Sequence, residues 1–294
     1  MASTQVESHR RRFRDLIMAP EILVLPGAWD GLSALLIEQA GFLGVYVTGG
    51  GIARSSGVPD IGLITMSEQV ARVRMICEAV SVPVLADADT GYGNALNLMR
   101  AVQEMEAAGA AGVHIEDQIT PKRCGHYEGK EVVARQEFVQ KIEAACAARR
   151  HDDFVIIART DARAVLGLEE AIQRGQECRQ AGADVIFVEA PQTVEEIQRV
   201  AEAIDAPLLL NMVCKGGKTP YVPTDELERM GYNIIIFASD VQRAAIVAMQ
   251  RLLRELHDKR TAEFFDDMVT FQERERIVNT AHYLQLQEQY LRMP

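Results

Sequence analysis

Eight short apolar runs recur along the chain, and their rhythm constrains the fold more than any other feature. The runs occupy residues 22–25, 44–47, 83–86, 112–115, 154–158, 184–188, 207–210 and 233–237. Each is rich in β-branched or other apolar residues at successive positions, which is typical of a parallel strand buried on both faces. The runs therefore predict eight parallel strands.

Helical patterns separate these runs. Apolar residues recur at about every 3.6 positions over residues 30–40, 67–80, 94–108, 135–149, 168–181, 194–204 and 224–230. Several of the patterns end at a glycine, as helix C-termini prefer: Gly41, Gly109, Gly182 and Gly231. Alternating β/α units without a break in composition predict a single-domain (β/α)8 barrel over about residues 20–255. A doubly wound sheet is the alternative.

The chain beyond residue 244 is predicted to be helical to its end, with an extension over about residues 256–294. This extension carries many large apolar side chains: Phe264, Phe265, Met268, Phe271, Ile277, Tyr283, Leu284, Leu286 and Tyr290. An isolated tail helix does not leave so much apolar surface in water. We expect it to pack on a neighbouring subunit, and packing on its own barrel is the alternative.

Charge and composition exclude several classes of function. The net charge of −11 repels nucleic acids and anionic membranes. No apolar run reaches the roughly 18 residues of a membrane helix, and the N-terminus lacks the apolar segment of a signal peptide, so we expect a cytoplasmic protein. The basic residues 10–12 are expected to be a solvated helix start. Five cysteines without a Cys-x-x-Cys pair predict neither disulfides nor structural zinc.

Polar residues close nearly every predicted strand. They are Thr48, Asp87, Asp89, Glu116, Asp117, Arg159, Asp161, Glu189, Asn211 and Asp240. In a barrel the C-terminal ends of the strands meet at one rim, where active sites lie. Any one of these residues could instead be a turn or helix cap.

Three of these carboxylates, Asp87, Asp89 and Glu116, predict a metal site. Strand alternation would point Asp87 and Asp89 the same way, and carboxylates held together require a cation. Oxygen ligands suit Mg²⁺, with Mn²⁺ possible. His114 is interpreted as a core or supporting histidine rather than a ligand.

Two further strand ends carry features suited to anions. Arg159 could bind a substrate carboxylate or stabilise an enolate oxygen, or could simply pair with Glu189 or Asp161. Residues 48–51, Thr-Gly-Gly-Gly, could turn backbone N–H groups toward an anion, although a tight turn would also need glycine.

The segment 121–130 after the fourth strand is polar, basic and without a regular pattern, which predicts a mobile lid. Cys124 lies between Arg123 and His126, close to Lys122. Positive neighbours lower the pKa of a thiol, so Cys124 is predicted to transfer a proton. A covalent role and an incidental loop cysteine are the alternatives.

Taken together, these residues resemble the isocitrate lyase/phosphoenolpyruvate mutase superfamily. The matching phrases include Asp-Ala-Asp-Thr-Gly-Tyr-Gly (87–93), His-Ile-Glu-Asp-Gln (114–118), Lys-Arg-Cys-Gly-His (122–126) and Ala-Arg-Thr-Asp-Ala (158–162), in the family's order. The phrase at 122–126 is typical of the lyase-like branch, which includes methylisocitrate lyase and 2,3-dimethylmalate lyase. It also occurs in carboxyphosphonoenolpyruvate mutase.

The resemblance implies a role for each candidate residue. Asp87 would bind Mg²⁺ directly, and Asp89 and Glu116 would act through metal-bound water. Arg159 would steady the enolate oxygen, and Cys124 would protonate the leaving carbanion. The resemblance also places the following residues at the substrate: Thr48, Gly49, Gly50, Asp60, Lys122, Arg123, His126, Glu189 and Asn211. Of these, His126 and Glu189 would join the catalytic group.

The resemblance further implies a Mg²⁺-dependent carbon–carbon lyase that cleaves a small anionic 2-hydroxy di- or tricarboxylate to pyruvate and a second carboxylate. Family members are commonly homotetramers with exchanged C-terminal helices. Departures at Cys214-Lys215 and at residues 237–240 leave two other activities open. These are a phosphonate-handling mutase or hydrolase, and an oxaloacetate decarboxylase or hydrolase. A binding module without catalysis is the remaining alternative.

Overall fold

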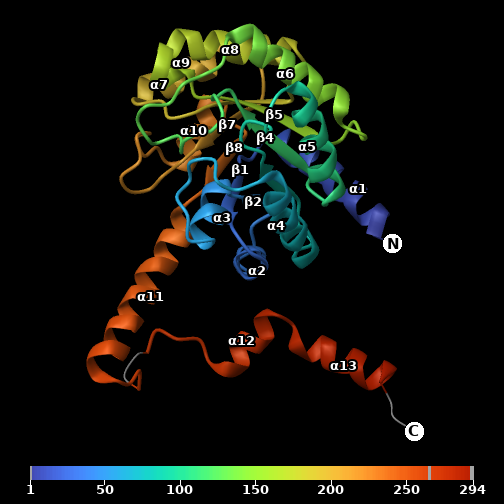
Figure 1. Ribbon diagram of the computed structural model, residues 1–294, viewed down its shortest axis with the longest axis vertical. Coiled ribbons are helices and arrows are strands. Elements are labelled where there is room, and N and C mark those ends of the chain that lie inside the picture. The colour runs from blue at the N-terminus through green and yellow to red at the C-terminus, as the bar shows by residue number, and fades with distance from the viewer. Residues whose placement is uncertain (1, 264–265, 292–294) are drawn as a thin grey trace. The chain divides into compact units, whose positions relative to one another are not determined.

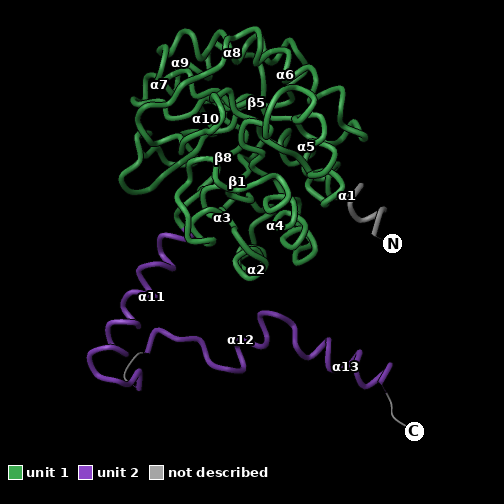
Figure 2. The backbone as a smooth tube through the Cα atoms, in the orientation of Figure 1, with its two compact units in different colours: residues 1–240 green, residues 241–294 purple. Residues whose placement is uncertain are grey.

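A computed structural model describes residues 2–263 and 266–291 of the chain. The backbone divides into two compact units, residues 1–240 and residues 241–294 (Figure 2).

Unit 1 is a closed barrel of eight parallel strands in the order β1-β2-β3-β4-β5-β6-β7-β8 (Figure 1). The strands are β1 (Leu23–Ala28), β2 (Val45–Val47), β3 (Val84–Asp87), β4 (Gly112–Glu116), β5 (Val155–Thr160), β6 (Val185–Val188), β7 (Leu208–Asn211) and β8 (Ile234–Phe237). Pairing of Leu23 on β1 with Ile234 on β8 closes the ring. The predicted (β/α)8 barrel is confirmed, and closure excludes the doubly wound sheet.

The predicted helices are present with their ends within one residue of the predicted positions. Unit 1 contains α1 (Ala2–Ile17), α2 (Gly31–Gln39), α3 (Gly49–Ser55), α4 (Met66–Ala79), α5 (Ala95–Ala107), α6 (Arg135–Ala148), α7 (Ala162–Leu166), α8 (Leu168–Gln180), α9 (Val194–Ala203) and α10 (Thr224–Met230). Local signals set several boundaries. The Thr65 side chain accepts a hydrogen bond from the Glu68 N–H and so caps α4, and Gly231 ends α10 in the left-handed conformation.

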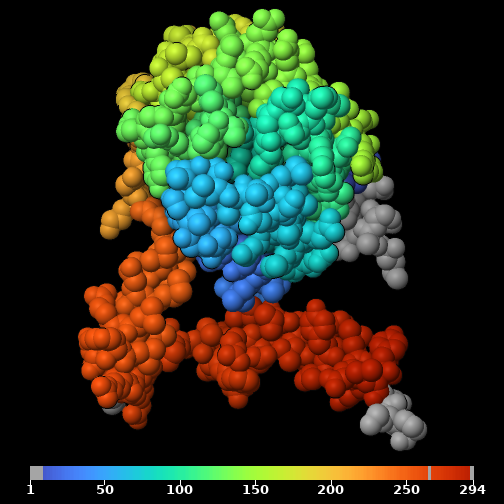
Figure 3. Space-filling model, in the orientation of Figure 1, coloured from blue at the N-terminus to red at the C-terminus, as the bar shows by residue number. Residues whose placement is uncertain are grey.

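Two apolar layers hold the barrel together. The outer layer packs the strands against the surrounding helices, whose side chains cover much of the face seen in Figure 3. The inner layer fills the barrel with side chains such as Leu25, Leu85 and Phe187, and Phe13 and Ile17 of α1 join it. Packing α1 here corrects part of one expectation. Arg10 is buried 3.8 Å from Glu106, whereas Arg11 and Arg12 are exposed, as expected of a solvated helix start.

Unit 2 contains α11 (Asp240–Lys259), which begins at the last residue of unit 1, followed by α12 (Phe271–Ile277) and α13 (Thr280–Tyr290). The expectation of unbroken helix beyond residue 244 was wrong, because α11 ends at Lys259 and α12 begins only at Phe271. Large apolar side chains are exposed on these helices: Val247, Met249, Leu253, Phe271, Tyr283, Leu284 and Tyr290. The predicted apolar residues Phe264 and Phe265 lie outside the described residues. Across the described chain, every helix is too short or too polar to cross a lipid bilayer.

Candidate active site

The C-terminal ends of neighbouring strands bring most of the candidate side chains together. Asp87 ends β3, Glu116 ends β4, Arg159 lies at the end of β5, Glu189 follows β6 and Asn211 ends β7. All five are buried. The sheet register sets Glu116 beside Arg159, so their side chains leave adjacent strands at the same level. The barrel therefore brings together at one rim five side chains that are spread over 125 positions of the sequence.

Arg159 lies at the centre of this cluster and contacts three carboxylates. Its Nη1 lies 3.1 Å from Glu116 Oε2, its Nε lies 3.0 Å from Asp161 Oδ2, and its Nη2 lies 3.5 Å from Glu189 Oε2. Burial alone would lower the pKa of this guanidinium, but the surrounding carboxylates raise it well above its ordinary value. Arg159 is therefore a permanent cation, and it pairs with both partners proposed from sequence.

Asp87 and Asp89 lie in different backbone conformations. Asp87 ends β3, whereas Asp89 has a positive φ of 47° and lies beyond the strand. Strand alternation was therefore the wrong reason to expect the two carboxylates to point the same way. The Asp87 carboxylate accepts hydrogen bonds from the N–H groups of Gly49 and Asp89, at 3.2 and 2.9 Å. The turn that follows β3, and not the strand itself, therefore sets the position of the Asp87 carboxylate relative to Asp89.

The charges around these two carboxylates separate their pKa values. Burial acts to raise the pKa of Asp87, but His114, Lys122 and Arg159 lower it to about 2. Burial raises the pKa of Asp89 to about 6, with Lys122 acting against the shift and Asp87 adding to it. Opposite shifts in neighbouring carboxylates are typical of functional sites.

Lys122 lies among the acidic side chains of this rim. Its Nζ is 2.6 Å from Asp60 Oδ1 and 2.8 Å from Asp89 Oδ1. Asp60 comes from the loop between α3 and α4, whereas Lys122 comes from the loop after β4. The predicted substrate residues Asp60 and Lys122 therefore form a buried ion pair across the mouth of the barrel.

His114 is completely buried below the carboxylates and supports them. Its Nε2 lies 2.8 Å from the Tyr46 hydroxyl and 3.4 Å from Asp87 Oδ1. Burial lowers the pKa of His114 to about 4, so the ring is neutral at pH 7. This placement agrees with the interpretation of His114 as a supporting residue.

The donor set fits a hydrated divalent cation. Both carboxylate oxygens of Glu116 are buried without a hydrogen bond among the described residues, and burial raises the pKa of Glu116 well above its ordinary value. A nearby cation would offset that penalty. Within the described chain, no three His, Cys, Asp or Glu side chains are grouped so that they could hold a metal ion directly. Mg²⁺ commonly keeps several waters and uses one or two carboxylates, which matches this arrangement.

The glycines after β2 begin a helix rather than a simple turn. Thr48 caps α3, and its side chain accepts a hydrogen bond from the N–H of Gly51 at 3.1 Å. A Cβ on Gly49 would lie 2.7 Å from Asp87 Oδ2, and a Cβ on Gly50 would lie 2.8 Å from Asp60 Oδ2. Glycine is therefore needed for this backbone to approach the two carboxylates. The sequence did not predict α3, because glycine has a low helix propensity.

The segment 121–130 (the lid) covers the cluster, and its mobility stays a prediction. The N–H of Cys124 donates to the Asp60 carbonyl at 3.2 Å, and His126 Nε2 lies 3.6 Å from Glu189 Oε1. Arg123 is exposed, and its side chain donates to the carbonyl of Glu128 at 3.3 Å. Of the four candidate residues on this segment, the structure brings Lys122, Cys124 and His126 to the site and turns the Arg123 side chain outward.

The pKa of Cys124 moves in the direction opposite to the sequence prediction. Burial and the Asp60 carboxylate raise it, and Lys122 and Arg54 only partly oppose this shift. The prediction weighed the positive neighbours but not the burial beneath the lid. The sulfur is therefore a thiol near neutral pH, a state suited to donating a proton rather than to attacking as a thiolate.

Comparison with known proteins places this arrangement in a family. Residues 13–257 match the family model described as phosphoenolpyruvate phosphomutase. The chain belongs to the phosphoenolpyruvate phosphomutase family. This membership confirms the resemblance seen in the sequence phrases.

Curated relatives of this phosphomutase-family chain include two named lyases. It is 48% identical over 264 residues to 2,3-dimethylmalate lyase of Eubacterium barkeri, covering 89% of this chain and 91% of the relative. It is 46% identical over 248 residues to 2-methylisocitrate lyase of Aeropyrum pernix, covering 84% and 80%.

Solved structures of the family superpose closely. Oxaloacetate acetylhydrolase in complex with 3,3-difluorooxalacetate matches with a TM-score of 0.91 and 35% identity, covering 96% of each chain. Phosphonopyruvate hydrolase in complex with oxalate and Mg²⁺ matches with a TM-score of 0.88 and 31% identity, covering 97% of this chain and 99% of that one.

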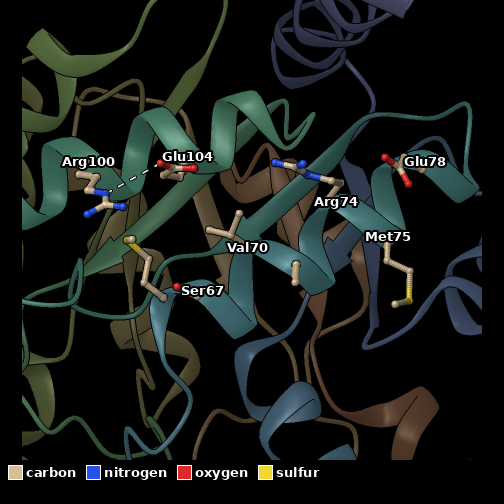
Figure 4. Close-up of a pocket in the computed structure, with 9 residues that line it drawn as sticks. Ser67, Val70, Arg74, Met75, Glu78, Arg100 and Glu104 are labelled. Carbon is tan, nitrogen blue, oxygen red and sulfur yellow. Dashed lines mark ion pairs between the residues drawn. The ribbon is translucent and has the colours of Figure 1, made fainter.

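Sequence reasoning missed Tyr46 and Lys130, which both reach the rim cluster. Neither ends a predicted strand, and a buried Lys130 within a basic loop gives no local signal. A separate groove of about 460 Å³ lies between α4 and α5, lined by residues such as Arg74, Met75 and Glu104 (Figure 4). It shares no residue with the rim cluster.

Proposed function

We propose that this chain is a Mg²⁺-dependent lyase that cleaves the C2–C3 bond of a 2-hydroxy di- or tricarboxylate to give pyruvate and a second carboxylate. One observation carries the proposal: a lid thiol, a permanent guanidinium and buried carboxylates, whose Glu116 oxygens accept no hydrogen bond among the described residues, meet at the C-terminal rim of the barrel. The two named lyases at 46–48% identity support the same reaction type.

We assign the metal site to Asp87 as the direct ligand, with Asp89 and Glu116 acting through water. Asp87 has its pKa lowered to about 2, so it is ionised and ready to bind a cation at neutral pH. Bound there, Mg²⁺ would supply positive charge to the carboxylate and 2-oxygen of the substrate. The Mg²⁺ in the related phosphonopyruvate hydrolase structure supports this assignment.

The chain's own residues account for binding the pyruvate half. We assign its carboxylate to the start of α3, where Thr48, Gly49 and Gly50 bring backbone close to the acidic cluster. Asp60 adjoins this region through Gly50. We assign Arg159 to the 2-oxygen, where a fixed guanidinium would stabilise negative charge without having to reorganise.

The reaction needs one proton removed and one proton delivered. The 2-hydroxyl proton passes to a carboxylate of the rim cluster, and the oxygen forms the carbonyl of pyruvate as the C2–C3 bond breaks. The electron pair of that bond passes to C3 and its carboxylate, and the Cys124 thiol then protonates C3. We assign the second half of the substrate to His126, Glu189, Asn211 and the loop cation Lys122, and not to Arg123, whose side chain is turned outward.

The substrate class within this reaction follows from the relatives. We propose a 2-methylisocitrate or a 2,3-dimethylmalate, because these are the substrates named for the similar lyases. The likeness to an oxaloacetate hydrolase and to a phosphonopyruvate hydrolase favours oxaloacetate and phosphonopyruvate as the competing substrates to test.

A substrate panel tests the proposal. The protein with Mg²⁺ is incubated with 2-methylisocitrate, 2,3-dimethylmalate, oxaloacetate or phosphonopyruvate, and pyruvate is followed by coupled lactate dehydrogenase. Samples without protein correct for spontaneous decarboxylation of oxaloacetate. We expect pyruvate from one of the first two substrates. Pyruvate from phosphonopyruvate alone would refute the lyase assignment, and tight keto-acid binding without turnover of any candidate would favour a binding module.

We also propose that the chain forms a homotetramer in which the helices of unit 2 pack on neighbouring subunits. The exposed apolar side chains of α11, α12 and α13 support this proposal, because such surface is usually covered. Light scattering coupled to size exclusion measures the mass directly. A monomeric mass at micromolar concentration would refute the proposal.

A further inference from the structure

The lid is fastened by a buried lysine at its far end. Lys130 is 7% exposed, and its ammonium donates to the carbonyl of Gly125 and to Asp161 Oδ1, the latter at 2.8 Å. Both contacts lie inside the protein, where an ammonium must keep its hydrogen bonds. Lys130 is the last residue of the lid and Gly125 lies in its middle, whereas Asp161 belongs to the barrel, so one ammonium joins the middle of the lid to the barrel.

Gly125 is a point of close approach between the lid backbone and the site. A Cβ at this position would lie 2.6 Å from Arg159 Nη2 and 2.7 Å from Glu189 Cδ. Its carbonyl is the lid group that Lys130 holds. The latch therefore acts on the part of the lid that rests against Arg159 and Glu189.

Asp161 is shared between the latch and Arg159. Its Oδ1 accepts from Lys130 Nζ and also from Arg159 Nη2 at 3.2 Å, and its Oδ2 accepts from Arg159 Nε at 3.0 Å. Its backbone N–H donates to Asp117 at 2.8 Å, which fixes the residue that bears the carboxylate. A change at Lys130 therefore reaches the guanidinium through a single carboxylate.

We propose that Lys130 is a positioning residue that couples closure of the lid to the orientation of Arg159 through Asp161. The coupling to turnover rests on the proposed function, because it assumes that Arg159 acts on the substrate. With the lid down, the ammonium is satisfied by Gly125 and Asp161 together. With the lid raised, the Lys130 ammonium loses its hydrogen bond to the Gly125 carbonyl. Its hydrogen bond to the Asp161 carboxylate can then change in length and direction.

The first test measures the lid and needs no substrate. Lys130→Met keeps the length of the side chain and removes its charge. The alkylation rates of Cys124 and of the exposed Cys214 by iodoacetamide are compared in the same molecule by peptide mass spectrometry. We expect the Cys124 rate, relative to Cys214, to rise about ten- to a hundredfold, as loss of a charged hydrogen bond implies. An unchanged ratio would overturn the latch.

Two further variants serve as controls for this measurement. Lys141 is also a buried lysine, but its ammonium donates to the carbonyls of Thr90 and Gly93 rather than to a residue of the lid. Lys141→Met is therefore expected to leave the alkylation ratio unchanged, and an equal rise would reduce Lys130 to a general structural role. If Lys130→Met does not fold, Lys130→Arg replaces it, and a ratio within about threefold of wild type is expected because a cation can still reach Asp161.

The second test separates the latch from the proposed activity. In pyruvate-release assays we expect Lys130→Met to lower kcat at least about tenfold with a smaller change in KM, because Arg159 would be misplaced in the closed state. Faster alkylation with normal kcat would overturn the coupling to Arg159. Faster alkylation in a protein whose wild type turns over none of the panel would refute the lyase and uphold the latch.

Discussion

Replacing Arg174 by methionine removes the buried cationic partner of Asp117 at the base of the site. Arg174 Nη1 lies 3.0 Å from Asp117 Oδ2, and both side chains are almost fully buried. Asp117 also accepts from Thr160 Oγ1 at 2.6 Å and from the Asp161 N–H at 2.8 Å. These bonds fix the end of β5, which carries Arg159. The change therefore probes the support of the site without touching the proposed substrate residues.

The expected loss of stability depends on pH. Burial raises the pKa of Asp117 to about 6 in the folded protein, Asp161 adds to the shift, and Thr160 and Arg174 oppose it. Because the folded pKa is above the unfolded value, protonation favours folding at low pH and this contribution is lost as pH rises through about 6. Without Arg174 one of the opposing causes is lost, so the pKa rises further and the folded variant holds the Asp117 proton to a higher pH.

The pKa values bound the magnitude of this effect. Holding the proton fully at pH 8 against a wild-type pKa of about 6 would cost about 3 kcal/mol, since each pKa unit corresponds to about 1.4 kcal/mol, and this is the upper limit of the loss at pH 8. At pH 5 Asp117 is already mostly protonated with or without Arg174, so the same contribution is close to zero. Loss of the Arg174 hydrogen bonds to Val133 and Glu170 adds about 1–2 kcal/mol at both pH values.

Urea unfolding at pH 5 and pH 8, at one protein concentration and followed by far-UV circular dichroism, measures both terms. Arg135→Met is the matched control, because Arg135 pairs with Glu170 and Glu177 while its side chain is 37% exposed. It should cost under about 1 kcal/mol at either pH. In a protein that already carries Asp117→Asn, the loss of unfolding free energy caused by Arg174→Met should be the same at pH 5 and pH 8. An equal loss at both pH values, or a larger loss at pH 5, would refute the reasoning.

Three other changes test the site itself. Cys124→Ser substitutes a much weaker acid and is expected to lower pyruvate release at least about a hundredfold without moving the unfolding curve; near-normal turnover would remove the thiol from the mechanism. Gly125→Ala forces a Cβ to within 2.6 Å of Arg159, so kcat/KM should fall at least about tenfold, whereas Gly31→Ala, whose nearest contact is 3.5 Å, should leave it unchanged. Equal values for the two alanine variants would contradict close lid packing. Saturating Mg²⁺ should raise the melting temperature of the wild type by a few degrees and that of Asp87→Asn hardly at all; equal shifts would exclude Asp87 as the ligand.

The order of strands and helices was predictable because its signals are local. Thr65 with Glu68 three positions later, or Gly231 after α10, marks a helix end within a few residues. Apolar runs that each end in a polar residue indicated a barrel with chemistry at one rim. α3 escaped prediction because it begins with three glycines, whose low helix propensity is overridden by the close approach of Gly49 to Asp87 and Gly50 to Asp60.

The sequence by itself determined the barrel, its rim of polar residues and the presence of a thiol and basic groups on one loop. Only the tertiary structure decided which charges meet: Lys122 with Asp60, 62 positions away, and Lys130 with Asp161. It also reversed the expected direction of the Cys124 pKa, because burial under the closed lid outweighs the neighbouring cations. Local patterns encode how the backbone folds, whereas the protonation state of a side chain depends on the solvent it loses and on charges brought near it from distant parts of the chain.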